Sequence, residues 1–372
     1  MKIALVTDSL DEHAGSRAAI SLACALHNQG VDVSIFVSDD LYSKETEARL
    51  TSLGIKASVV KRPLLNVLGR FLSKIPLGFK TAILINKEKY DLISFHGSPE
   101  TLVGLRILTR LPIVTTYYGT QITDTVLKRL ITKLRASLWV YLSNNVVAIS
   151  KYCCQELADL FGYSKAPVIY PGIESAVTSK WGSGSENFRH DGISILSVSR
   201  FVPYKGFLEL IEILRNLVST GLNVRATLAG NPADKKYYEE MKRAVKDLPI
   251  TIVINPTDEE LASLYLSCDV YVSGSRWEGF GLTYLEASSY GKPALGLRKA
   301  SVPEVIEDSK TGYLCNNFVE VERRLRELTN NLPLRAELGE AGRSFSLNFS
   351  WKSAAAAYIS LFKETLTTKN GK

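Results

Sequence analysis

Short apolar strands alternate with amphipathic helices along this chain, and this alternation restricts the possible folds more than any other feature. A strand is expected at residues 3–7, a helix at 18–28 and a second strand at 31–38. Further strands are expected at 57–60, 92–95, 113–117, 145–149 and 168–170, with helical segments between most of them. This order is typical of a parallel α/β sheet, in which each helix returns the chain to the start of the next strand.

A polar, glycine-rich stretch at residues 181–185 interrupts the alternation, which then begins again. Strands are expected at 193–198, 224–229, 250–254 and 270–273, with helices at 208–217, 236–246 and 258–267. We therefore expect two Rossmann-like domains, residues 1–175 and 190–350, that face each other across a cleft. The length of 372 residues also favours two hydrophobic cores over one.

The densest motif of the second half, Glu278 to Glu286, follows the expected strand 270–273, and ligands of such sheets bind beyond the carboxyl ends of the strands. A helix should begin near Gly281, so that the backbone N–H groups of its first turn, which includes Leu282 and Thr283, can hold a phosphate. The two carboxylates flank this phosphate site. They suit a ligand that carries both hydroxyls and phosphates, as a nucleotide sugar does.

A second motif, residues 199–206, follows the expected strand 193–198 and contains Arg200 and Lys205. Two cations in one loop after a strand can contact a single pyrophosphate from two sides. In a transferase they would neutralise the charge that develops on a departing nucleoside diphosphate. We therefore expect a donor site that does not need a metal ion.

These motifs, together with Leu228-Ala229-Gly230 and Gly291-Lys292-Pro293, resemble the retaining GT-B glycosyltransferases of family 4, also called group 1 glycosyltransferases. The resemblance covers the second half in order and the first half more loosely. It implies a GT-B fold of two Rossmann-like domains and the transfer of a hexose from a nucleotide sugar with retention of configuration. It also implies that the last helix, residues 351–367, crosses back onto the first domain.

The resemblance assigns roles to several residues of the second half. Glu278, with the backbone around Phe280 and Gly281, would hold the donor sugar, and Glu286 would hold the ribose hydroxyls. Arg200 and Lys205 would bind the pyrophosphate. Separately from the resemblance, we expect the nucleotide base to stack near Gly230-Asn231 and Asn255-Pro256-Thr257, residues that do not identify the base.

The first half departs from the family in two places. The family usually has a glycine-rich turn after its first strand, where this chain offers only Gly15 and Ser16 as candidates. The family often has a histidine after the strand that corresponds to residues 113–117, where this chain has Tyr118. His96 ends the preceding expected strand, and the sequence leaves open whether Tyr118 or His96 contacts the sugar.

The positive charge of the chain is unevenly distributed, although the net charge is only +7. Residues 48–87 contain eight Lys or Arg and no acid, and in residues 126–135 cations alternate with aliphatic side chains. Such segments favour an anionic membrane surface or a lipid-linked or phosphorylated glycan acceptor. Nucleic acid is not expected, because aromatic residues do not interleave with the cations.

The start of the chain does not resemble a signal peptide, and no apolar stretch reaches the ~18 residues of a membrane span. The five cysteines lack metal-ligand spacing, and the four histidines are scattered. We therefore expect a cytoplasmic enzyme without a metal site, able to lie peripherally on the cytoplasmic face of the membrane.

Three other functions remain to be weighed against a transferase. A catalytically silent sugar-nucleotide-binding subunit is supported by Tyr118 and the sparse glycine turn. A nucleotide-sugar epimerase would need acid–base residues that the first half does not reveal. A nicotinamide dehydrogenase is disfavoured because no G-x-G-x-x-G follows either first strand. The donor sugar, the base and the acceptor are not determined by the sequence.

Overall fold

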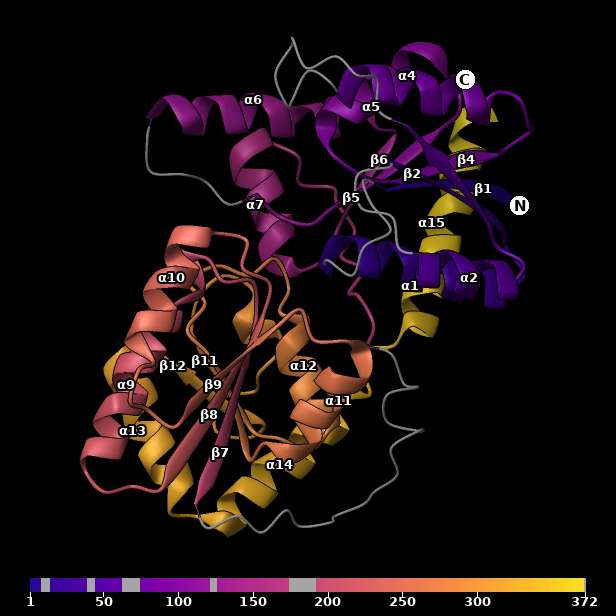
Figure 1. The fold of residues 1–372 in the computed structure, drawn as a ribbon. Coiled ribbons are helices and arrows are strands. Elements are labelled where there is room, and N and C mark those ends of the chain that lie inside the picture. The colour runs from indigo at the N-terminus through magenta and orange to yellow at the C-terminus, as the bar shows by residue number, and fades with distance from the viewer. Residues whose placement is uncertain (8–13, 39–43, 62–73, 121–125, 174–191, 371–372) are drawn as a thin grey trace. The chain divides into compact units, whose positions relative to one another are not determined.

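The structure, a computed structural model, describes residues 1–7, 14–38, 44–61, 74–120, 126–173 and 192–370. The chain forms two compact units (Figure 1). The first unit comprises Met1–Gly172 and Phe349–Lys372, and the second comprises Ile173–Asn348.

The first unit is built on a six-stranded parallel sheet with the strand order β3-β2-β1-β4-β5-β6. The central strand β1 lies between β2 and β4, and Leu5 aligns with Ile35 on one side and Ser94 on the other. The strands are β1 (Lys2–Thr7), β2 (Asp32–Ser38), β3 (Lys56–Val60), β4 (Leu92–His96), β5 (Ile113–Tyr117) and β6 (Asn145–Ala148).

Helices cover both faces of this sheet (Figure 1). The helices are α1 (Ala14–Asn28), α2 (Lys44–Ser52), α4 (Lys74–Ile85), α5 (Pro99–Leu108), α6 (Val126–Leu142), α7 (Lys151–Phe161) and α15 (Trp351–Asn370). The last of these packs beside α1, and its residues Ala355, Tyr358 and Phe362 share a core with Leu5 and Leu22. The C-terminal segment is therefore part of the first hydrophobic core.

The second unit repeats the architecture with the strand order β12-β11-β10-β7-β8-β9, again all parallel. Its strands are β7 (Ile193–Val198), β8 (Val224–Gly230), β9 (Ile250–Ile254), β10 (Val270–Ser273), β11 (Ala294–Leu297) and β12 (Gly312–Cys315). Its helices are α9 (Phe207–Ser219), α10 (Lys235–Ala244), α11 (Asp258–Ser267), α12 (Leu282–Ser289), α13 (Phe318–Thr329) and α14 (Leu332–Ser346), with short 3-10 turns η2 (Pro203–Lys205) and η3 (Val302–Glu304). The expected pair of Rossmann-like α/β sheets is thus confirmed.

One expected strand is wrong. Of residues 168–170, only Val168 pairs with the sheet, through a single bridge to Ala148. Pro171 follows directly, and proline has no N–H with which to extend a ladder. The short strands β11 and β12 were not expected, because each contains a glycine and no β-branched residue, whereas the equally short β6 and β10 each contain two valines.

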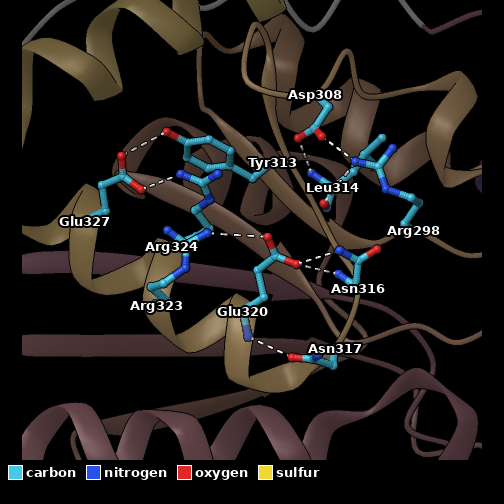
Figure 2. Close-up of polar contacts among 10 residues, drawn as sticks. All are labelled: Arg298, Asp308, Tyr313, Leu314, Asn316, Asn317, Glu320, Arg323, Arg324 and Glu327. Carbon is cyan, nitrogen blue, oxygen red and sulfur yellow. Dashed lines mark hydrogen bonds and ion pairs between the residues drawn. The ribbon is translucent and has the colours of Figure 1, made fainter.

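A charged network fixes the edge of the second sheet, where β12 leads into α13 (Figure 2). Asn317 caps α13 by accepting a hydrogen bond from the backbone N–H of Glu320 at 3.0 Å. Arg324 lies 4.0 Å from the centre of the Tyr313 ring and is paired with Glu327 at 2.8 Å. These carboxylates and cations neutralise one another, so we assign the network a structural role.

No helix among the described segments is long and apolar enough to cross a membrane.

Candidate functional site

The candidate residues of the second unit come from loops at the carboxyl ends of three adjacent strands. Strand β7 lies between β10 and β8, so the loops that follow these strands are neighbours. Arg200 and Lys205 follow β7, Gly230 ends β8, and Glu278 follows β10. The parallel sheet therefore brings together residues that are up to 78 positions apart in the sequence, as between Arg200 and Glu278.

Lys205 and Glu278 form an ion pair across two of these loops. The Nζ of Lys205 donates to Oε1 of Glu278 at 2.6 Å, and only 8% and 14% of the two side chains are exposed. The ammonium also lies 5.3 Å from the centre of the Tyr204 ring. The sequence interpretation gave these two residues separate ligand groups, and the structure shows that they also bind each other.

Arg200 lies on the same loop but is exposed. Its guanidinium donates to the hydroxyl of Tyr204 at 2.6 Å. Tyr204 thus contacts both cations of the loop, one through its hydroxyl and one through its ring. The sequence interpretation did not identify this tyrosine as part of the site.

Ser301 makes hydrogen bonds to the backbone of the loop that leads into α12. The hydroxyl of this fully buried serine lies 2.9 Å from the carbonyl oxygens of both Glu278 and Phe280. Gly281 then turns the chain into α12 with a φ of +104°, a backbone conformation that favours glycine. Gly281 has no side chain to cap the helix, and in the first turn the backbone N–H of Tyr284 donates to the carbonyl oxygen of Gly281 at 3.2 Å. A helix N-terminus without a side-chain cap can bind an anion.

Two buried tyrosines contact polar side chains of α12. The hydroxyl of Tyr265 donates to Oε2 of Glu286 at 2.8 Å, and the hydroxyl of Tyr271 lies 2.7 Å from Oγ1 of Thr283. Burial raises the pKa of both phenols, so they are neutral hydrogen-bond donors at physiological pH. Leu282, the first residue of the helix, is half-buried.

Glycines allow the loops to approach one another closely. A Cβ at Gly206 would lie 2.3 Å from the carbonyl oxygen of Gly274, and one at Gly230 would lie 1.7 Å from that of Ser199. The following residue, Asn231, accepts a backbone hydrogen bond from Phe201 at 2.7 Å. The loops after β7, β8 and β10 are thus packed backbone against backbone.

In the first unit, His96 and Tyr118 contact each other at the carboxyl ends of β4 and β5. His96 Nδ1 lies 2.9 Å from the hydroxyl of Tyr118, and its Nε2 lies 2.9 Å from that of Ser94. Both rings line a small pocket together with Thr116 and Tyr358. Burial lowers the pKa of His96 to about 3 and raises that of Tyr118 well above 10, so both groups are neutral at physiological pH.

Gly15 and Ser16 lie in the first turn of α1. The side chain of Ser16 is outside the part of the structure that is described.

Sequence reasoning missed Tyr204, Tyr265 and Ser301. Tyr265 lies in a helix of mixed apolar residues, where an aromatic side chain is read as core, and Ser301 lies in a loop without a recognised motif. Tyr204 directly precedes Lys205 in the sequence, and this is the signal that could have suggested a role for it.

Two family models match consecutive parts of the chain. The model described as "Glycosyltransferase Family 4" matches residues 15–177, and "Glycosyl transferases group 1" matches residues 183–345. The chain belongs to the group 1 glycosyltransferases of family 4. It is therefore a glycosyltransferase.

Similar proteins include other glycosyltransferases. An uncharacterised glycosyltransferase of Methanocaldococcus jannaschii is 28% identical over 76% of this chain and 77% of its own length. A D-inositol 3-phosphate glycosyltransferase of Corynebacterium efficiens is 25% identical over 94% of this chain and 90% of its own.

The fold of this glycosyltransferase is also that of solved structures. Anabaena HepE in complex with UDP and glucose superimposes with a TM-score of 0.82 at 19% identity, covering 98% of this chain and 100% of HepE. This likeness shows the GT-B fold.

Proposed function

We propose that this glycosyltransferase moves a hexose from a nucleotide sugar to a lipid-linked or phosphorylated glycan acceptor, with retention of configuration. The observation that carries the proposal is the Lys205–Glu278 ion pair, held between two loops next to the first turn of α12. A cation, a carboxylate and a helix N-terminus together match a ligand that carries both phosphate and hydroxyl groups.

Donor binding exchanges the partners of this pair. The pyrophosphate replaces Glu278 as the partner of Lys205, while the hydroxyls of the hexose donate to Glu278. Both groups stay paired throughout, which matters because they are largely buried and an unpaired buried charge is costly. Glu286, further along α12, accepts hydrogen bonds from the ribose.

The chemical step breaks the bond between the anomeric carbon and the β-phosphate oxygen. Lys205, Arg200 and the N-terminus of α12 stabilise the charge that develops on the departing nucleoside diphosphate. The acceptor oxygen bonds to the anomeric carbon on the same face, and its proton passes to the departing phosphate. No residue has to act as a strong base. This agrees with the pKa of His96, which burial lowers to about 3 and which is too low for an effective base at neutral pH, and with the raised pKa of Tyr118, which keeps its phenol protonated.

The donor is tested with a panel of UDP-, GDP- and ADP-sugars in the presence of candidate acceptors. Release of nucleoside diphosphate together with a glycosylated product supports transfer, and NMR of the product should show the anomeric configuration of the donor. Binding without turnover, with any donor and acceptor, would instead indicate a silent sugar-nucleotide-binding subunit. HepE, which is similar in fold, binds UDP, so UDP-sugars are tested first.

A phosphorylated acceptor is supported by the similarity to the D-inositol 3-phosphate glycosyltransferase of C. efficiens, whose name gives a phosphorylated substrate. Because the two cations of the donor loop serve the pyrophosphate, we place the acceptor phosphate on the first unit. Residues 48–61 and 74–87 of the basic run belong to this unit, and residues 62–73 lie outside the described residues.

A lipid-linked acceptor is supported by α6. This helix exposes 55% of Leu130, 47% of Ile131 and 61% of Leu134, and Lys133 lies on the same helix. Exposed aliphatic side chains beside cations are typical of helices that bind an anionic lipid surface. We therefore place the reaction at the cytoplasmic face of a membrane.

The membrane assignment is tested by co-sedimentation with anionic and neutral vesicles at low and high salt. Leu134→Gln should weaken binding to anionic vesicles, whereas Leu347→Gln, at a residue of the second unit that is 77% exposed, should not. Absence of binding to anionic vesicles at low salt would favour a water-soluble acceptor.

A further inference from the structure

Tyr265 contacts α12, the helix that carries the proposed ribose ligand Glu286. It belongs to α11, is only 2% exposed, and donates from its hydroxyl to Oε2 of Glu286 at 2.8 Å. Its ring stacks on that of Tyr290, with centroids 5.5 Å apart and an angle of 13° between the planes. The ring of Tyr271 lies 6.1 Å from that of Tyr265, with an angle of 42° between the planes.

The direction of this hydrogen bond is set by chemistry. An ionised carboxylate only accepts, so the phenol must be the donor. Burial and the nearby carboxylate keep the phenol protonated. Because Tyr265 is buried and packs against two aromatic rings, its hydroxyl is a fixed donor to which Glu286 is hydrogen-bonded.

We propose that Tyr265 is a positioning residue that holds Glu286 toward the ribose, and that it thereby sets the preference of the donor site for nucleotides with an intact 2′,3′-diol. This inference rests on the assignment of Glu286 to the ribose in the proposed function.

The physical reason is the flexibility of a glutamate. Three rotatable bonds separate its carboxylate from the backbone. The carboxylate binds a diol favourably only in the orientation in which it accepts hydrogen bonds from both hydroxyls. Tyr265 occupies one of about four acceptor sites and fixes the plane of the group before the nucleotide binds. Without this hydroxyl, the carboxylate loses one of the contacts that orient it, and nucleotide binding must restrict the side chain further.

The chain offers a matched control in the same aromatic stack. The hydroxyl of Tyr290 is buried and has no hydrogen-bond partner among the described residues. Tyr265→Phe and Tyr290→Phe therefore delete the same atom from two stacked rings, and only the first deletion removes a contact to Glu286. Both variants keep the ring, so the packing of α11 on α12 is preserved.

The test is calorimetric titration of the full-length wild type and both variants. The ligands are UDP, GDP and ADP, each paired with its 2′,3′-dideoxy counterpart. For the nucleotide that binds, we expect Tyr265→Phe to reduce the preference for the diol about tenfold, since a hydrogen bond to a charged group is lost. The affinity for the dideoxy nucleotide should stay within about twofold of the wild-type value, and Tyr290→Phe should keep the full preference.

Two results would overturn the inference. An equal loss of affinity for both nucleotides in Tyr265→Phe would mean that the residue only supports the fold. If the wild-type enzyme showed no preference for the diol, the assignment of Glu286 to the ribose would be wrong, and the inference depends on that assignment. Either result is distinct from failure of the proposed function, which requires that no sugar is transferred from any nucleotide sugar.

Discussion

The ammonium of Lys205 has one carboxylate partner among the described residues, that of Glu278, and both groups are largely buried. In such surroundings a charge that loses its partner is costly, and removal of one member of a buried pair costs about 3–5 kcal/mol. A substitution in this pair can therefore lower the stability of the protein as well as its activity. Kinetic parameters are needed to separate the two effects.

Lys205→Ala and Glu286→Ala should affect different kinetic parameters. In the proposed mechanism Lys205 meets charge that develops in the transition state, so its loss should lower kcat on the order of 10²-fold or more. Loss of Glu286, the proposed ligand of the ribose, should mainly raise KM. Steady-state kinetics with the accepted donor measures both. The control Lys242→Ala, at an exposed lysine of α10, should leave both unchanged, and a Lys205→Ala enzyme with altered KM alone would contradict the assigned role.

His96 should make the stability of the protein depend on pH. Burial lowers its pKa to about 3 from an ordinary value of 6.5, so between these values the unfolded chain binds a proton that the folded protein does not. Stability is therefore fully present above pH 6.5 and falls as the pH decreases, by about 1.4 kcal/mol per pH unit.

His96→Asn removes this titration. Urea unfolding at pH 7 and pH 5 should show that the wild type loses about 2 kcal/mol more than the variant over this interval. An identical pH dependence of the two proteins would show that another group is responsible.

At the scale of elements, the sequence predicts most strands correctly and misses two short ones. The helix expected at 208–217 is α9, Phe207–Ser219, and the helix expected to begin near Gly281 begins at Leu282. Strands β11 and β12 each contain a glycine and no β-branched residue, whereas β6 and β10, which are equally short, each contain two valines and were predicted. These two strands are defined by pairing, of β11 with β10 and of β12 with β11, and local sequence does not reveal such pairing.

The candidate site shows the same limit. Glycines and charged residues after strands were identified because a parallel sheet dictates where such loops gather. Tyr265 and Ser301 were not, because each acts through a contact more than 20 positions away in the sequence, to Glu286 and to the carbonyl of Phe280.

Gly206, which precedes α9, should be far less tolerant of substitution than a similar glycine elsewhere. Gly206 and Gly221 have φ values of +70° and +81°, so alanine is strained at both. A Cβ at Gly206 would also lie 2.3 Å from a backbone oxygen, whereas one at Gly221 meets no atom within 4 Å. Gly221→Ala should cost about 1 kcal/mol of unfolding free energy, and Gly206→Ala clearly more, with loss of donor binding. Equal melting temperatures of the two variants would contradict this reasoning.

At the scale of the whole molecule, the chain forms two units, and its last segment belongs to the first of them. The local sequence of α15 predicts a helix but not its partner, because alanine-rich faces pack against many surfaces. The resemblance to the family provided the expectation that this helix crosses back. The structure places Phe362 in the core of the first unit, fully buried.

Phe362→Ala should therefore destabilise the first unit rather than the second. Loss of a buried phenylalanine costs about 3–5 kcal/mol, whereas the control Leu347→Ala, at a residue that is 77% exposed, should stay within about 0.5 kcal/mol. Hydrogen exchange followed by mass spectrometry reports the two units separately. We expect faster exchange in peptides of β1, β2 and α1, and comparable loss of protection in β7 and β8 would contradict the assignment of α15.

The Lys205–Glu278 pair also bears on how the spent donor departs. Glu278 is a competitor that is tethered to the enzyme and cannot diffuse away. In the proposed mechanism the hydroxyls of the bound hexose donate to Glu278, and Lys205 pairs with the pyrophosphate instead. Once the hexose has been transferred, Glu278 can return to Lys205 and displace the nucleoside diphosphate. We therefore expect weak product inhibition, with turnover sustained at product concentrations that would otherwise saturate the site.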